Sequence, residues 1–204
     1  MTVAVTGSFA SGKSTLVEMF GSLGAETVSA DEIVHDLLAG DEETISRVVE
    51  RFGEDVVDER GVDRRALGRK VFAEEGALRD LEEILHPLVR RETERRIEAS
   101  TADLFVAEIP LLFEGEGSGT FNYTVAVVVP EERRLAWAAQ RGVDEAALRA
   151  IEARQLGQQE KARRADVVLQ NDGDLDRLRR RAEELKERIS SERGSDGSVQ
   201  PQEP

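Results

Sequence analysis

The chain has 204 residues, of which 42 are acidic and 28 basic, so its formal net charge is −14. This acidic balance argues against a general nucleic-acid-binding protein, which needs a basic surface, and no apolar run is long enough to span a bilayer. With no cysteine and two histidines, neither a disulfide framework nor a zinc-ligand cluster is expected. We expect an α/β protein with no nucleic-acid or membrane partner, no signal peptide and a cytoplasmic location.

The first predicted elements surround a phosphate-binding motif. Residues 2–6 form an apolar, β-branched run that predicts a buried strand, and residues 16–20 predict a helix. Between them, Gly-Ser-Phe-Ala-Ser-Gly-Lys-Ser-Thr at 7–15 fits the pattern G-x-x-x-x-G-K-[ST]. In this strand–loop–helix arrangement, backbone N–H groups and the helix dipole bind phosphate, so we predict a nucleoside triphosphate site.

Each polar side chain of the loop has an expected role. Lys13 is expected to reach the β- and γ-phosphates, and the Ser14 hydroxyl to ligate Mg²⁺. The residues that we assign to nucleotide binding in this loop are Gly7, Ala10, Ser11, Gly12, Lys13, Ser14 and Thr15.

A second strand is predicted at 26–30, and residues 31–100 after it have an almost wholly helical pattern. Helices are expected at 31–38, 44–52, 64–72 and 77–99. Pro87 is expected to end or kink the last of these near His86. So long a helical insertion between two strands predicts a subdomain, assigned to 31–100.

The remaining strands are predicted at 103–109, 122–129 and 165–169, with helices at 131–141, 145–163 and 175–189. Strands alternating with helices predict a five-stranded parallel sheet whose carboxyl ends hold the ligand. We expect a P-loop NTPase core at 1–30 and 101–189, a small helical lid at about 138–163 and a disordered tail at 190–204.

Two carboxylates follow predicted strands at this edge. Asp31 closes the second strand and is expected to face the γ-phosphate, where it can accept the proton of a substrate hydroxyl. Its alternative role, compatible with the first, is the N-cap of a helix that starts at Glu32. Glu108 ends the third strand and resembles a Walker-B acid that holds Mg²⁺, or is an ordinary acid at a strand end.

Basic residues supply further candidates. His86 and Arg90 lie one turn apart and can meet a phosphate or an adenine edge of an acceptor, although a histidine before proline is often a capping or packing residue. Arginine fingers often come from the segment between the fourth and fifth strands, which contains Arg141, Arg154, Arg163 and Arg164. Most of these fit a solvated helix, and Arg141 is singled out because a lid can hinge at Gly142 beside it.

Several segments, in this order and spacing, resemble the bacterial-type dephospho-CoA kinases. They are 30–35, 61–67, 71–72, 85–89, 109–114, 140–143, 154–155, 165–166 and 171–173, in addition to the loop. The most distinctive is Ile-Pro-Leu-Leu-Phe-Glu at 109–114, and the resemblance extends from residue 2 to about residue 178.

The resemblance implies ATP-dependent phosphorylation of the ribose 3′-hydroxyl of dephospho-CoA, with ATP and Mg²⁺ at a P-loop core and a CoA-binding helical insertion. Asp31 matches the family's general base, and Arg141 lies at its lid, so the catalytic residues implied are Asp31, Lys13 and Arg141. The acceptor-binding residues implied are His35, His86, Arg90 and Leu112. Asn171 and Gly173 are expected near the adenine, Ser14 and Glu108 at the metal, and the protein as a monomer or weak homo-oligomer.

The sequence departs from the family pattern at three positions. Ser29 stands where the family has its first aspartate, which removes a metal or substrate contact. Ser8 and Ala10 stand where the family usually has glycine, and Ala10 loses the freedom of glycine at positive φ. The backbone N–H donors survive these changes, so ATP binding is expected to remain.

Three other functions compete with this one. The nearest is a nucleoside or nucleoside-monophosphate kinase on the same core. A GTP-switch protein would carry Asn-Lys-x-Asp, which the chain lacks, although 58–61 fits D-x-x-G. A CoA-binding protein without catalysis fits Ser29 and Ala10 but not the retained Lys13, Ser14 and Asp31.

Overall fold

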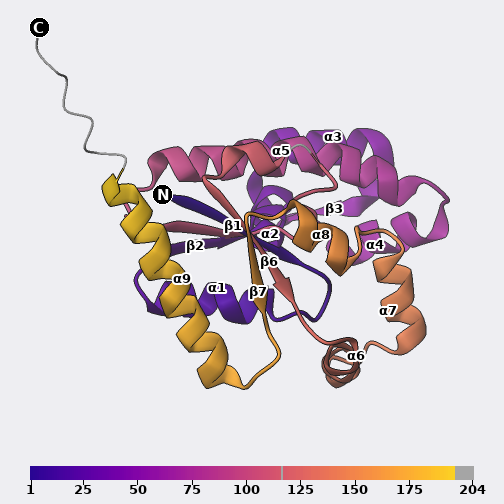
Figure 1. Ribbon diagram of the computed structural model, residues 1–204. Helices are drawn as coiled ribbons and strands as arrows, with labels where there is room; N and C mark the ends of the chain where they lie inside the picture. Colours follow the sequence, from indigo (N-terminus) through magenta and orange to yellow (C-terminus); the bar gives the residue numbers. More distant parts are fainter. Residues whose placement is uncertain (116, 196–204) are drawn as a thin grey trace, which may run out of the picture. The chain divides into compact units, whose positions relative to one another are not determined.

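The computed structural model describes residues 1–115 and 117–195, and the chain divides into two compact units (Figure 1). One unit consists of Met1–Thr27 together with the chain from Ser100 onward, and the other is Val28–Ala99. None of the described helices combines the length and the apolar character that crossing a bilayer requires.

A five-stranded sheet of order β2-β5-β1-β6-β7 organises the first unit, and the chain passes into the second unit within the edge strand β2. Its strands are β1 (Thr2–Gly7), β2 (Glu26–Ser29), β5 (Phe105–Glu108), β6 (Tyr123–Val128) and β7 (Val167–Gln170). The ladders of β1 with β5 and β6, and of β6 with β7, are parallel, which confirms the predicted parallel sheet. β1 lies in the middle and is covered on both faces, so it is an almost continuous apolar run.

Helices supply the apolar cover of this sheet. α1 (Lys13–Ser22) and α9 (Leu175–Ser195) contact each other and lie side by side in Figure 1. Leu16, Phe20, Leu178 and Ile189 from these two helices share one buried cluster with the valines of β1, β5 and β6. α8 (Gln158–Arg164) contacts β1 and β6, while α6 (Glu131–Gln140) packs on α7 (Glu145–Glu152). A short 3₁₀ turn, η2, covers Gly117–Thr120.

The second unit is largely helical around its own core. It contains α2 (Ala30–Gly40), α3 (Glu42–Phe52), η1 (Glu54–Val56), β3 (Val57–Asp58), β4 (Gly61–Val62), α4 (Arg64–Ala73) and α5 (Ala77–Ala99). α5 contacts each of the other three helices, and its Leu85 is buried with Val48, Phe52 and Leu67. The antiparallel β3–β4 hairpin was not predicted, because two-residue strands carry no periodicity.

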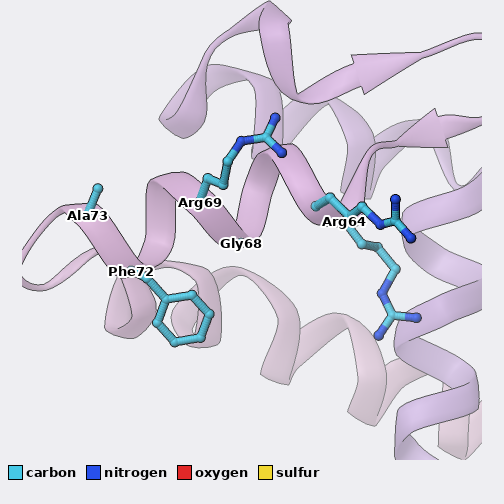
Figure 2. Close-up of a pocket in the computed structure, with 6 residues that line it drawn as sticks. Arg64, Gly68, Arg69, Phe72 and Ala73 are labelled. Carbon is cyan, nitrogen blue, oxygen red and sulfur yellow. The ribbon is translucent and has the colours of Figure 1, made fainter.

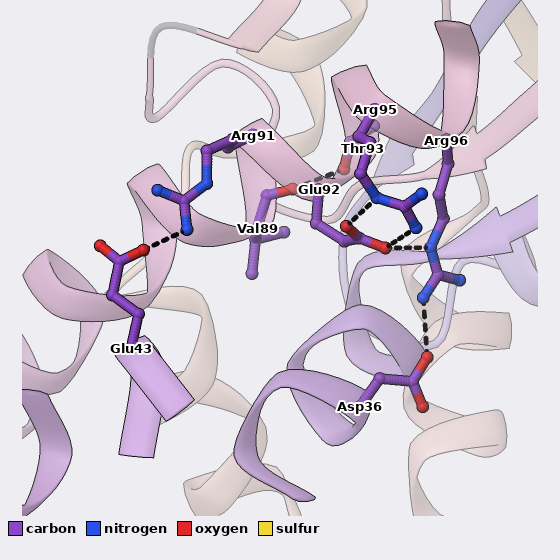
Figure 3. A network of polar contacts seen from close by, with 8 residues as sticks. All are labelled: Asp36, Glu43, Val89, Arg91, Glu92, Thr93, Arg95 and Arg96. Atoms are coloured by element: carbon purple, nitrogen blue, oxygen red, sulfur yellow. Dashed lines mark hydrogen bonds and ion pairs between the residues drawn. The ribbon is translucent and has the colours of Figure 1, made fainter. Parts of the chain in front are cut away.

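Ion pairs tie α5 to its neighbours in this unit (Figure 3). Arg96 bonds the Glu92 carboxylate at 2.8 Å and Asp36 of α2 at 2.7 Å. Arg91 bonds Glu43 of α3 at 2.5 Å. The hydrogen bond from Arg95, with further help from Arg96, lowers the pKa of Glu92 to about 2 although burial acts in the opposite direction.

Two predicted boundaries are wrong, whereas the helix predicted at 77–99 is confirmed as α5. Pro87 does not end this helix near His86, and a kink there stays a prediction; the burial of Leu85 and Leu88 on both sides of the proline offsets one lost backbone hydrogen bond. The helix predicted at 145–163 is two helices, separated at 153–157 where Gly157 is the N-cap of α8. α9 continues past residue 189 to Ser195, and the rest of the predicted disordered tail lies outside the described residues.

The position of Asp31 also needs correction. β2 ends at Ser29 and α2 begins at Ala30, so Asp31 lies in the first turn of a helix and not at the end of a strand. Ser29 is the N-cap: its hydroxyl accepts a hydrogen bond from the Asp31 amide, and its own amide bonds the Glu32 carboxylate. The alternative role of Asp31 as the N-cap is therefore wrong.

Candidate active site

The loop between β1 and α1 has the backbone shape of a phosphate cradle. Gly12 has φ 90°, and a Cβ there would lie 2.3 Å from Asn171 Nδ2, so only glycine fits. Ala10 is the single non-glycine residue with positive φ among those described, at 57°. This conformation is unfavourable for alanine, but its methyl group is buried with Ala138 and Leu148, which offsets part of that penalty.

Lys13 and Ser11 face inward in this loop. Lys13 is 8% exposed, and its ammonium group donates to the Ser8 carbonyl at 3.0 Å. Ser11 is fully buried, and its hydroxyl has no hydrogen-bond partner within the described parts of the chain. An unsatisfied hydroxyl and a buried ammonium group at the start of a helix fit a ligand that brings phosphate oxygens.

Ser14 and Glu108 provide the oxygen ligands that Mg²⁺ prefers. The Ser14 hydroxyl, at the start of α1, donates to Glu108 Oε1 at 3.0 Å, and Glu108 lies beside Val5 in the β1–β5 ladder. Residues 1–115 and 117–195 contain no group of three or more His, Cys, Asp or Glu that could hold a metal. The site therefore fits a Mg²⁺ ion whose other ligands are nucleotide phosphates and water.

Asn171 supports the loop from behind. It follows β7, is buried, and donates from its side chain to the Ser11 carbonyl at 2.9 Å while its amide bonds Val128 at 2.7 Å. Its predicted place near adenine stays a prediction, whereas its contact with the loop was not expected. Gly173, two residues on, accepts a hydrogen bond from Arg133 through its carbonyl.

Arg141 is the candidate arginine that the structure brings to the loop. It follows α6, and its guanidinium lies 5.9 Å from the centroid of the Phe9 ring, within cation–π range. Gly142 beside it has φ 75°. Arg163 bonds Glu160 along α8, as the alternative of a solvated helix predicts, and Arg154 is exposed. Arg164 bonds Glu160 as well, but it also donates to the Phe113 carbonyl.

The acceptor candidates of the second unit lie at its surface. Asp31 and His35 are both exposed and one turn apart on α2, and His86 and Arg90 are related in the same way on α5. The Asp31 carboxylate makes no hydrogen bond or ion pair with the residues described. Leu112 lies in the other unit and is 1% exposed, and its role in acceptor binding stays a prediction.

A hollow lies along α4, at residues to which the sequence analysis gave no binding role (Figure 2). It is lined by Arg64, Arg65, Gly68, Arg69, Phe72 and Ala73. Phe72 is 83% exposed, and the three arginines form no ion pair with any described residue, although most arginines of this unit do. An unpaired cationic cluster beside an exposed ring fits an anionic ligand with an apolar part. The arginine-rich pattern at 64–69 was a readable signal for it.

Comparison with known proteins shows a consistent similarity. Residues 1–177 match the family model described as dephospho-CoA kinase. A dephospho-CoA kinase from Frankia casuarinae is 38% identical over 90% of this chain and 81% of its own, and one from Protochlamydia amoebophila is 36% identical over 90% and 93%.

Solved structures agree with these relatives. TT1252 from Thermus thermophilus superposes with TM-score 0.74 and 33% identity over 94% of this chain and 97% of its own. A dephospho-CoA kinase from Campylobacter jejuni gives TM-score 0.68 and 29% identity over 94% and 98%. Shikimate kinase from Acinetobacter baumannii, at 13% identity and TM-score 0.54 over 98% and 95%, shares the fold.

Proposed function

The chain belongs to the dephospho-CoA kinase family, whose members catalyse the last step of coenzyme A synthesis, and on that premise we propose how it works. The γ-phosphoryl group of ATP passes to the ribose 3′-hydroxyl of dephospho-CoA. One P–O bond to ADP breaks, one P–O bond to the ribose forms, and the hydroxyl proton leaves. The family match favours this function over a nucleoside kinase.

The observation that carries the proposal is the loop with its buried lysine and its serine–glutamate pair. Lys13 binds the β- and γ-phosphates together with the loop amides, which replaces its present bond to the Ser8 carbonyl. Ser14 and Glu108 would hold Mg²⁺, which would neutralise charge on the phosphate oxygens. Arg141, whose guanidinium lies over the ring of the loop residue Phe9, stabilises the charge of the transferring group.

Asp31 is the proposed general base. Its carboxylate is exposed and forms no hydrogen bond or ion pair with the described residues, so it is available to accept the proton of the 3′-hydroxyl. Ser29 and Glu32 fix the turn that carries it through their reciprocal hydrogen bonds. The mechanism requires this carboxylate to reach the hydroxyl while the γ-phosphate is held in line.

The second unit, with the insertion at 31–100, is proposed to bind the acceptor, and the segment at about 138–163 to act as a lid. His35, His86 and Arg90 are proposed acceptor contacts. The arginines of the α4 hollow suit the diphosphate of dephospho-CoA, and Phe72 suits an apolar part of the same molecule. A cytoplasmic, monomeric or weakly associating enzyme stays a prediction.

Coupled ADP release tests the proposal with dephospho-CoA as acceptor, against a panel of nucleosides and nucleoside monophosphates. Among these acceptors we expect turnover only with dephospho-CoA, and a product that carries a new 3′-phosphate. In Asp31→Asn, kcat should fall by about 10²–10⁴-fold, the span of a general base, while ATP affinity stays unchanged.

Glu32→Gln is the matched control, because it removes a neighbouring charge in the same helical turn while glutamine keeps the capping contact. Its kcat should stay within about twofold of wild type. A loss in Asp31→Asn confined to KM would instead make Asp31 a substrate-positioning residue, and preferred turnover of a nucleoside would overturn the assignment.

A further inference from the structure

Lys161 is a buried cation that the mechanism above does not use. It lies in α8, is 0% exposed, and bonds the Glu114 carboxylate at 2.9 Å. It also donates to the Pro110 carbonyl. Burying an ammonium group is unfavourable unless it is paired, and removing one partner of a buried pair is strongly unfavourable, so the position of Lys161 is closely tied to these two oxygens.

The segment that Lys161 holds is 110–114, which directly follows the end of β5. Pro110 has no N–H to extend the β1–β5 ladder beyond Ile109, whose amide bonds Val5 at 2.9 Å. Other groups therefore fix this segment. The Leu156 amide donates to Glu114 at 2.8 Å, and Arg164 donates to the Phe113 carbonyl at 3.1 Å.

The Pro110 carbonyl joins this segment to the nucleotide loop. It accepts a second hydrogen bond, at 3.1 Å, from the hydroxyl of Thr6, a fully buried residue that directly precedes Gly7. One carbonyl oxygen thus receives a donor from the strand that leads into the loop and a donor from α8. Glu108, the partner of Ser14, is only two residues before it.

α8 is itself fixed to the sheet. The Gln158 side chain accepts from the Val129 amide at 2.8 Å and donates to the Val129 carbonyl at 3.0 Å, just after β6. Lys161 therefore projects from an anchored helix and can hold 110–114 in one position.

We propose that Lys161 is a positioning residue for phosphoryl transfer: it fixes the Pro110 carbonyl and the Glu114 carboxylate, and thereby holds Glu108 within reach of Ser14. The catalytic consequence of this role rests on the proposed function. The contacts themselves are a property of the first unit alone.

Lys161→Met tests the role, because methionine keeps the length and apolar stem of the side chain but removes the donor. We expect kcat to fall and the Mg²⁺ concentration for half-maximal activity to rise, each by about 10–100-fold, the usual effect of removing a group that orients a metal ligand. Independently of turnover, calorimetry should show weaker binding of Mg²⁺–ATP, and the amides of 111–114 should exchange hydrogen faster.

Lys186→Met is the matched control. Lys186 also donates to a backbone carbonyl in the same unit, that of Leu23, which caps the end of α1 opposite the loop. This variant should keep the kinetic constants and the Mg²⁺ dependence of wild type.

Thr6→Val provides a second test should Lys161→Met fail to fold. It removes the other donor to the Pro110 carbonyl with little change of volume, and should lower kcat with the same shift in Mg²⁺ dependence. Because both side chains act through one carbonyl, the combined variant should lose less than the product of the two single losses.

Two results would overturn the proposal. One is a folded Lys161→Met with wild-type Mg²⁺ dependence and wild-type exchange at 111–114, and the other is an equal kinetic loss in Lys186→Met. If the wild-type protein did not phosphorylate dephospho-CoA, the proposed function would fail, while Mg²⁺–ATP affinity and hydrogen exchange would still decide the role of Lys161.

Discussion

At the scale of single residues, Ser29 has a role other than the one expected from the family pattern. The resemblance places an aspartate there, and its loss was expected to remove a metal or substrate contact. In the structure Ser29 caps α2 and forms a capping box with Glu32. Serine and aspartate are both good N-caps, so the first turn of α2, which carries Asp31, keeps its geometry after the exchange.

Ser29→Ala should therefore lower the free energy of unfolding by about 1 kcal/mol, the usual value of an N-cap side chain. Ser29→Asp should leave it nearly unchanged, because aspartate caps as well as serine. Denaturant unfolding of the three proteins measures this, with Ser190→Ala as a control at an exposed serine of α9. An equal loss in the alanine and aspartate variants would show that capping is not what Ser29 contributes.

At the scale of elements, α4 has two chemically different faces. One face is buried within the second unit and consists of Ala66, Leu67 and Val71. The other face is exposed at the hollow of Figure 2, where Arg69 and Phe72 lie. In a chain of net charge −14, an anionic substrate is captured by local positive charge and not by the overall field. The exposed face of α4 is such a local charge.

Arg69→Gln should raise KM for dephospho-CoA by about tenfold, the effect of losing one charged hydrogen bond, while KM for ATP stays unchanged. Arg79→Gln is the control, because it removes the same charge from an arginine of the same unit that is 82% exposed and paired with Glu83. Steady-state kinetics with each substrate varied in turn distinguish the two. Equal changes in both variants would mean that general charge, and not the hollow, attracts the acceptor.

At the scale of the whole molecule, several of the acidic side chains behind the net charge of −14 are paired with arginines. Glu92 lies at the centre of the clearest network, between Arg95 and Arg96, and Arg96 continues to Asp36 (Figure 3). The pKa of Glu92 is lowered to about 2, from an ordinary value of 4.5. The folded state therefore binds the Glu92 proton less tightly than the unfolded state does.

This difference gives stability a pH dependence with a definite sign. The contribution of Glu92 is fully present above pH 4.5 and is lost as the pH falls from 4.5 towards 2. The upper bound of the Glu92 contribution is about 3 kcal/mol. Screening by solvent makes the actual contribution smaller, because the partner Arg95 is exposed. The hydrogen bonds from the Thr44 hydroxyl and amide lower the pKa of Asp41, so Asp41 contributes to stability with the same pH dependence.

Glu92→Gln should be less stable than wild type at pH 7, and this gap should close as the pH falls towards 2. Urea unfolding at several pH values between 7 and 2 measures the gap. Glu98→Gln, at an exposed acid of the same helix, should show no such convergence. A gap in Glu92→Gln that stayed constant with pH would mean that packing, and not ionisation, accounts for the loss.

The sequence by itself determined the features that are local. The five strands, the phosphate loop and most helices follow from apolar periodicity and from a motif of eight consecutive residues. The cap of α2 was equally readable, since Ser29 and Glu32 have capping-box spacing, yet it was missed. Such features depend on neighbours a few residues away, so the order of the residues is enough to predict them.

Only the tertiary structure decided the features that depend on distant partners. Asn171 reaches the loop across 160 positions of sequence, and Lys161 meets Pro110 across 51. The local pattern predicted α5 at 77–99 but left open whether Pro87 ends it, and in the fold the helix continues past the proline. Burial and pairing are set by which surfaces meet after folding, and a local pattern carries no record of a partner so far along the chain.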